Sequence, residues 1–174
     1  MRHLTSADYR RMPWANGRGT TVELWREDTG GGLSFRLSMA TVAEGGPFSA
    51  FPGIDRVLTV ISGPGFRLCG PGHDLRADPL RPVAFPGDVP IAAEGVSAPS
   101  EDFNVMVARG RPVRVEVGRP GQGMVAERLF CFALAPATLR LGGRDIALNA
   151  QDLLAAEGAV HVVAGGPVLL TGLG

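Results

Sequence analysis

Two arginines are the residues of this 174-residue chain best suited to binding an anion. Arg36 lies in the alternating stretch Leu33–Ala40, on its polar side together with Ser38. Arg56 opens the apolar run Val57–Ile61, where the pattern otherwise requires burial. The forked donors of a guanidinium match the geometry of a planar carboxylate. We therefore predict that Arg36 and Arg56 line one pocket and bind a small carboxylate there.

Other polar and aromatic residues are candidates for the same pocket. Asn104 alternates with apolar neighbours, so its amide faces either solvent or a pocket, and Met106 shares its face. Glu23 has no second carboxylate beside it in the sequence, so we expect it to orient an arginine rather than act as a base. Phe48 and Phe51 are expected to wall the cavity. The predicted ligand-binding residues are Trp14, Asn16, Glu23, Arg36, Ser38, Phe48, Ser49, Arg56 and Asn104.

A structural interpretation of the same residues stays open. Arg56 can pair with Asp55, and Arg36 with Glu23, as ordinary salt bridges. Trp14, which precedes an Asn-Gly turn signal, is typical of a core residue as well as of a stacking residue.

No catalytic or metal-ligating set is evident. The histidines, His3, His73 and His161, have no second histidine or carboxylate at ligand spacing. Cys69 and Cys131 are too few for a disulfide framework, and we expect both to be reduced thiols. We predict no catalytic residue, no metal and no cofactor.

The charge composition bears on the partners of the chain. All 17 basic residues are arginines, and they balance 17 acidic residues. A net charge of zero does not favour binding to nucleic acid or to an anionic membrane surface. No run of about 18 apolar residues is present. We expect a soluble, cytoplasmic protein whose partner is a small anionic metabolite, with the oligomeric state open between monomer and homodimer.

The elements that must position these residues are short strands. Thr20–Arg26 alternates, with Thr21, Glu23 and Trp25 expected on one face. Gly70–Pro82 is expected to be a loop, and Gln151–Ala156 fits a helical turn or a strand. Turns are predicted at Pro64-Gly65 and Gly142-Gly143. Further strands are predicted at Leu33–Ala40, Val57–Ile61, Phe66–Cys69, Val83–Phe85, Phe103–Arg109, Val113–Val117, Leu129–Leu134, Leu139–Leu141, Asp145–Leu148, Val160–Val163 and Val168–Thr171.

A weak internal repeat suggests two units. The segment Gly87–Gly95 resembles Gln151–Gly158, and Pro64–Leu68 resembles Pro136–Leu141, in the same order. With Gly118–Gly123 as a candidate linker, we predict residues 1–118 as an N-terminal arm and first barrel. Residues 119–174 form a smaller second unit against which the arm packs.

Part of the chain resembles the first cupin motif, G-x5-H-x-H-x3-4-E-x6-G, through the spacing from Arg56 to Gly63. Ser49 and Phe51, or Ala50 and Pro52, stand at the two histidine positions, and Arg56 stands for the glutamate. A cupin metal site needs those imidazoles and that carboxylate together. The resemblance thus implies the barrel without its metal.

Four blocks over about the first 110 residues resemble the HutD/Ves family of small bicupins more closely. They are Trp14-x-Asn16-Gly17-x-Gly19-Thr20-x-x-Glu23-Leu24, Phe35-Arg36-Leu37-Ser38-x-Ala40, Gly46-Pro47-Phe48-Ser49-x-Phe51-Pro52-Gly53-x-Asp55-Arg56 and Asp102-Phe103-Asn104-Val105-Met106. The resemblance implies an all-β bicupin: two cupin-like β-barrels or jelly-roll units, the second smaller. It also implies a regulatory role linked to histidine utilisation.

The function expected is non-catalytic, metal-free binding of a carboxylate metabolite, with urocanate or N-formylglutamate as candidates from the family association. Two alternatives remain. One is a metal-independent cupin enzyme, an isomerase or lyase that uses Glu23 or Asp55 as base. The other is a structural or interaction module whose barrel is filled by side chains.

Overall fold

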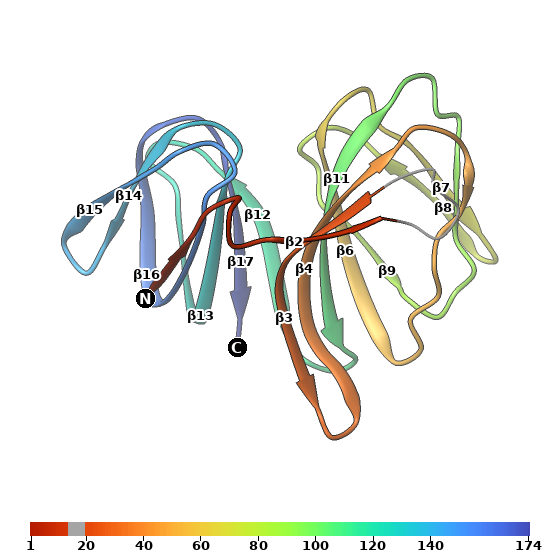
Figure 1. Cartoon of the computed structure of the whole chain (residues 1–174), viewed down its shortest axis with the longest axis horizontal. Helices are drawn as coiled ribbons and strands as arrows, with labels where there is room; N and C mark the ends of the chain where they lie inside the picture. Colours follow the sequence, from red (N-terminus) through yellow and green to blue (C-terminus); the bar gives the residue numbers. More distant parts are fainter. Residues whose placement is uncertain (14–19) are drawn as a thin grey trace. The chain divides into compact units, whose positions relative to one another are not determined.

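The computed structural model describes residues 1–13 and 20–174, all of whose regular elements are strands (Figure 1). The predicted site residues Trp14 and Asn16 lie outside this range. Within it, no helix long and apolar enough to cross a membrane is found. The all-β prediction is confirmed. The contacts divide the chain into two compact units, Arg10–Gly110 (the N-terminal unit) and Met1–Tyr9 with Arg111–Gly174 (the C-terminal unit).

The N-terminal unit consists of two antiparallel sheets. One sheet has the strand order β2-β3-β4-β11-β6-β9 and the other β5-β10-β7-β8. Their bounds are β2 (Arg10–Pro13), β3 (Thr20–Thr29), β4 (Gly32–Val42), β5 (Gly46–Pro47), β6 (Ile54–Ser62), β7 (Phe66–Gly70), β8 (His73–Ala77), β9 (Val83–Pro86), β10 (Ala92–Glu94) and β11 (Ser100–Ala108).

Residues from both sheets form one apolar core. It unites Val42, Leu58, Val60, Phe66, Leu68, Ala77, Phe85, Ile91 and Ala93, all buried. The two sheets therefore face each other, and the even-numbered side chains of β4, β6 and β11 point between them.

The C-terminal unit is built on one sheet with the order β12-β17-β13-β16-β14-β15, to which β1 adds by pairing with β16. The strands are β1 (Arg2–Leu4), β12 (Val113–Gly118), β13 (Gly123–Ala133), β14 (Ala137–Leu141), β15 (Arg144–Leu148), β16 (Leu153–Gly165) and β17 (Val168–Leu173). Its core cluster draws on β13 to β17, so the sheet curls around its own apolar side chains. Figure 1 shows the N-terminus beside β16.

Three features differ from the sequence-based expectations. The predicted loop Gly70–Pro82 contains β8, which forms a hairpin with β7. The ambiguous segment Gln151–Ala156 enters β16 as strand. The segment Gly118–Gly123 joins β12 to β13, both of which pair with β17, so it is a turn inside the C-terminal unit and the division falls at Arg111 instead.

A bulge in β3 corrects the expected faces of that strand. Glu23 lies opposite Ser38, but Trp25 lies opposite Leu37, which leaves Leu24 as the extra residue. Because one inserted residue reverses all later side chains, Glu23 and Trp25 point to opposite faces instead of sharing one. Arg26, opposite Arg36, joins Glu23 on the inner face.

The predicted glycine turns are confirmed, since φ is +80° at Gly65, +78° at Gly143 and +87° at Gly63. A Cβ at Gly63 would lie 2.4 Å from the carbonyl oxygen of Pro99. Gly63 thus satisfies two constraints at once, a left-handed backbone and a close approach of Pro99, the residue directly before β11.

Replacing Gly63 by valine is expected to lower the free energy of unfolding by at least about 1–3 kcal/mol, because both constraints are violated. Denaturant unfolding measures this loss. Gly143→Val is the matched control, since it carries the same strain at φ +78° but its Cβ meets no other described atom within 4 Å. If both variants lost the same free energy of unfolding, the close approach of Pro99 to Gly63 would have no effect on stability.

Candidate functional site

The register of three neighbouring strands brings the predicted polar residues together. On β11, Met106 lies opposite Arg36 of β4 and opposite Arg56 of β6. Two residues earlier on β11, Asn104 lies opposite Ser38. Since side chains directly across a ladder point to the same face, these residues share the inner face of the sheet. The predicted polar face of β4 is therefore present.

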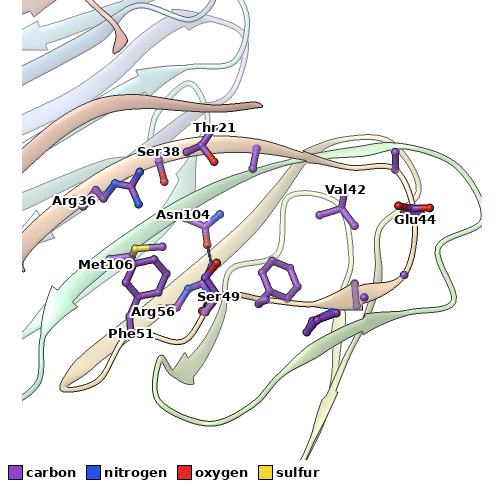
Figure 2. A pocket seen from close by; sticks show the side chains of 17 residues that line it. Thr21, Arg36, Ser38, Val42, Glu44, Ser49, Phe51, Arg56, Asn104 and Met106 are labelled. Atoms are coloured by element: carbon purple, nitrogen blue, oxygen red, sulfur yellow. Dashed lines mark hydrogen bonds between the residues drawn. The ribbon is translucent and has the colours of Figure 1, made fainter. Parts of the chain in front are cut away.

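This face borders a cavity of about 940 Å³. Figure 2 shows Arg36, Ser38, Asn104 and Arg56 at one end, which we call the polar end, with Val42 and Glu44 at the other. The predicted residues that line the cavity are Arg36, Ser38, Phe48, Ser49, Arg56 and Asn104, joined by Phe51 and Met106. Glu23 is not part of the lining and acts through Arg36, as described below. Sequence reasoning missed Thr21, Ala40, Val42, Pro47 and Ala93 and the rim Ala43–Gly46.

Arg56 is a buried cation in an aromatic surround. Its guanidinium carbon lies 5.2 Å from the ring centre of Phe48, 5.6 Å from that of Phe51 and 5.0 Å from that of Phe85. The whole residue is 4% exposed. Burial lowers the pKa of Arg56 to about 10, Arg36 adds to this, and Asp102 opposes it. Arg56 stays charged at neutral pH, but at a cost in solvation.

The donors of Arg56 are incompletely used. Nη2 donates to Oδ1 of Asn104 at 2.6 Å, and Nη1 approaches the carbonyl oxygen of Ser49 at 3.5 Å. Nε has no hydrogen-bond partner among the described residues. The expected alternative pairing with Asp55 is wrong, because adjacent strand residues point to opposite faces and Asp55 binds Arg109 at 3.1 Å.

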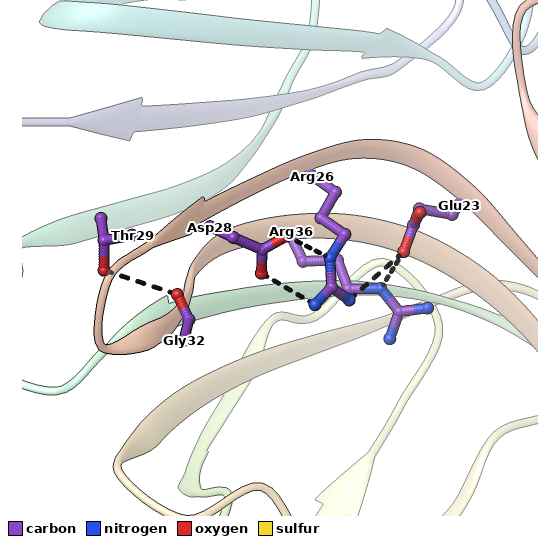
Figure 3. Close-up of polar contacts among 6 residues, drawn as sticks. All are labelled: Glu23, Arg26, Asp28, Thr29, Gly32 and Arg36. Carbon is purple, nitrogen blue, oxygen red and sulfur yellow. Dashed lines mark hydrogen bonds and ion pairs between the residues drawn. The ribbon is translucent and has the colours of Figure 1, made fainter.

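Arg36, in contrast, has a carboxylate partner. Its Nε donates to Oε2 of Glu23 at 2.7 Å, and both side chains are 9% exposed. The bulge in β3 brings Arg26 to 3.8 Å from the same oxygen, as Figure 3 shows. The predicted Arg36–Glu23 pairing is confirmed, and the charge of Arg36 is balanced inside the protein.

A buried carboxyl group lies behind the polar end. Asp102 has no exposed surface, and its Oδ1 accepts a hydrogen bond from Nδ2 of Asn104. Its Oδ2 has no partner in the described part of the chain. Burial raises the pKa of Asp102 to about 7, against the opposing effects of Arg56 and Asn104. Alternation along β11 could have predicted this residue, since Asp102 precedes Asn104 by two.

The chemistry available is anion binding. The described residues include no group of three or more His, Cys, Asp or Glu side chains that could hold a metal ion. The polar end instead offers Arg56, a desolvated cation that touches no carboxylate in the described part of the chain. A planar anion in the cavity would find charge-assisted donors there.

Comparisons with known proteins agree with the fold. The family model HutD matches residues 6–167. An uncharacterized 21.2 kDa protein encoded in the hutC 3′ region of Pseudomonas putida is 40% identical over 113 residues, which cover 62% of this chain. The match spans 58% of that relative.

Solved structures extend the similarity to nearly the full chain. HutD from Pseudomonas fluorescens SBW25 is 33% identical with a TM-score of 0.84, covering 99% of this chain and 97% of its own. A conserved protein from Pseudomonas aeruginosa PAO1 is 32% identical with a TM-score of 0.85, covering 98% and 95%. A cupin 2 barrel protein from Leptotrichia buccalis, 8% identical with a TM-score of 0.58 and covering 95% and 96%, shares the fold alone.

The names of these relatives link the group to a histidine-utilisation locus. The match to the family model over 162 residues, from 6 to 167, and the all-β cupin-like architecture lead to one conclusion. The chain belongs to the HutD family.

Proposed function

We propose that this protein binds a small carboxylate metabolite at the polar end of its cavity, without catalysis and without a metal, in a regulatory role linked to histidine utilisation. The observation that carries the proposal is Arg56, a residue that is 4% exposed and whose guanidinium contacts no carboxylate of the described residues. Leaving a buried charge without an ionic partner costs roughly 3–5 kcal/mol. A bound carboxylate would recover part of that cost, which gives the ligand its affinity.

The charge balance supports one carboxylate rather than two. Glu23 already neutralises Arg36 at 2.7 Å, so of these two arginines it is Arg56 that has no contacting counter-charge among the described residues. A second ligand carboxylate near Arg36 would meet Glu23 and be repelled. Of the two candidates suggested by the family link, urocanate carries one carboxylate and N-formylglutamate two. The site therefore favours urocanate or another monocarboxylate.

The two alternatives have less support. The bases considered for an enzyme, Glu23 and Asp55, are each held in an ion pair with an arginine. Such pairing favours the charged carboxylate and weakens it as a base. A filled structural barrel would not leave a cavity of about 940 Å³ with arginines at one end.

Arg56→Lys is expected to weaken carboxylate binding about ten- to hundredfold, because a point charge does not reproduce the fork of a guanidinium. Calorimetric titration with urocanate and N-formylglutamate measures the change. Arg67→Lys, an exposed substitution on β7, is the matched control and should bind like the parent. If Arg56→Lys has the melting temperature of the parent and binds equally well, Arg56 is structural.

Arg36→Met is expected to weaken binding by a similar factor, but for two separable reasons. It removes a donor, and it leaves the Glu23 carboxylate near the anion with Arg26, at 3.8 Å, in place of the closer Arg36 as its counter-charge. Adding Glu23→Gln restores neutrality without restoring the donor. Partial recovery of affinity in the double variant is expected. Parental affinity in both variants would remove Arg36 from the site.

Purified protein is expected to carry no stoichiometric transition metal, because Ser49, Phe51 and Arg56 occupy the positions that correspond to metal ligands in the cupin motif. Elemental analysis after dialysis tests this expectation. About one zinc, iron or manganese ion per chain would contradict it and would favour the enzyme alternative.

A further inference from the structure

Asp102 is a buried acid to which the proposed function assigns no task. Asp102 precedes Asn104 by two residues on β11 and is not part of the lining of the cavity. The amide of Asn104 connects it to the site: the carbonyl oxygen accepts from Arg56, and the amino group donates to Asp102. Arg56, Asn104 and Asp102 thus form one hydrogen-bonded row from the cavity into the core.

We propose that Asp102 is a positioning residue that exchanges charge with the ligand: when a monocarboxylate binds beside Arg56, Asp102 takes up one proton from solvent. The proposal rests on the proposed function, because it requires a carboxylate at the polar end. It adds that the site accepts an anion and a proton together, and that Asp102 therefore determines the pH range of binding.

The electrostatic argument begins with the unliganded site. Asp102 and Arg56 face each other across Asn104, and within residues 1–13 and 20–174 no other counter-ion contacts either of them. A ligand carboxylate beside Arg56 places two anions around one cation. Two carboxylates that share a site cannot both stay ionised without a large penalty, so one of them binds a proton.

The partners of the two carboxylates decide which one is protonated. The ligand carboxylate has the fork of Arg56 and the open side of the cavity, both of which stabilise its charged form. Asp102 has a single amide donor, no exposed surface and an unpaired Oδ2. A carboxyl group in such surroundings favours its neutral form. The proton therefore goes to Asp102.

The other charged groups that face the row Arg56–Asn104–Asp102 do not change which of the two carboxylates is protonated. From β4 comes Arg36, and from β3 come Glu23, which pairs with it, and Arg26. Glu101, next to Asp102 on β11, is exposed and adds a small repulsion in the same direction. Strand β9, which pairs with β6, consists of Val83–Pro86 and contributes no charge.

The sign of the pH dependence follows from the pKa of Asp102, about 7 in the unliganded protein because of burial. Bound anion raises it further. Below that pH the proton is already present, and affinity is constant. Above it each binding event must supply the proton, so the dissociation constant rises up to about tenfold per pH unit.

The experiment is calorimetric titration of the whole chain with acetate and with urocanate at about pH 7.5 in HEPES and in Tris, whose ionisation enthalpies differ. The difference between the binding enthalpies observed in the two buffers gives the number of protons taken up per ligand bound. For the parent we expect uptake of about one half to one proton per carboxylate bound. The dissociation constant should rise between about pH 7 and pH 9.

Asp102→Asn keeps the size of the side chain and an oxygen that can accept from Asn104. It is expected to bind without proton uptake and with a dissociation constant that is flat over the same range. Asp88→Asn removes a carboxylate that binds Arg109 on the surface, and it should keep the parental uptake and slope. A purely structural Asp102 would change the melting temperature but not the slope.

The outcomes separate the two proposals. If no carboxylate probe binds, the proposed function fails and this inference fails with it. If a probe binds without proton uptake, only the inference is overturned. Infrared spectra need no ligand: a carboxyl C=O band that Asp102→Asn lacks should fade as the pH rises through about 7. A parent spectrum without that band would also overturn the inference.

Discussion

The desolvation of a single guanidinium determines how the N-terminal unit is built around its cavity. Arg56 is the third residue of β6, which continues into the core, so its charge is buried together with the strand. Three phenylalanine rings at 5.0–5.6 Å offset part of the cost, at about 0.5–2 kcal/mol each. The amide of Asn104 adds one charge-assisted hydrogen bond. Without the three rings and the amide, the charge of Arg56 could not be buried at this end of β6. Even with them, the guanidinium has N–H donors that no described residue uses.

The second arginine shows what a fully compensated charge requires in the same sheet. Arg36 is balanced by Glu23, which lies opposite Ser38 on the inner face, directly before the bulge at Leu24. The reversal after the bulge also turns Arg26 inward. A regular strand would have placed Trp25 where it could share the face of Glu23. Of the two arginines, Arg36 is thus paired with a carboxylate, whereas no carboxylate of the described residues contacts Arg56, and under the proposed function this asymmetry favours a single bound anion.

The period-2 pattern in the sequence was enough to predict most strands, the all-β class and the lining residues Arg36, Ser38 and Asn104. It succeeded because alternation along β4 and β11 survives in the structure and the inward residues meet across the ladder. It failed where one residue changes the phase, as at Leu24, and where polar residues form a short edge strand, as in β8. The partner of Arg56 was also missed, since strand neighbours such as Asp55 point away while Asn104, 48 residues later in the sequence, lies across the sheet.

A comparison with the cupin motif explains why such a site suits this barrel. In that motif two histidines and a glutamate hold a metal cation, and the cation can attract an anionic ligand. Here Arg56 stands at the glutamate position, so the positive charge belongs to the chain and is present without a metal. A guanidinium is fixed and cannot activate water, so under the proposed function the same location serves recognition rather than hydrolysis. A permanent buried cation also needs a counter-charge when no ligand is present. Asp102 can supply that charge when ionised and withdraw it when protonated, which a site built from a metal and neutral imidazoles has no reason to require.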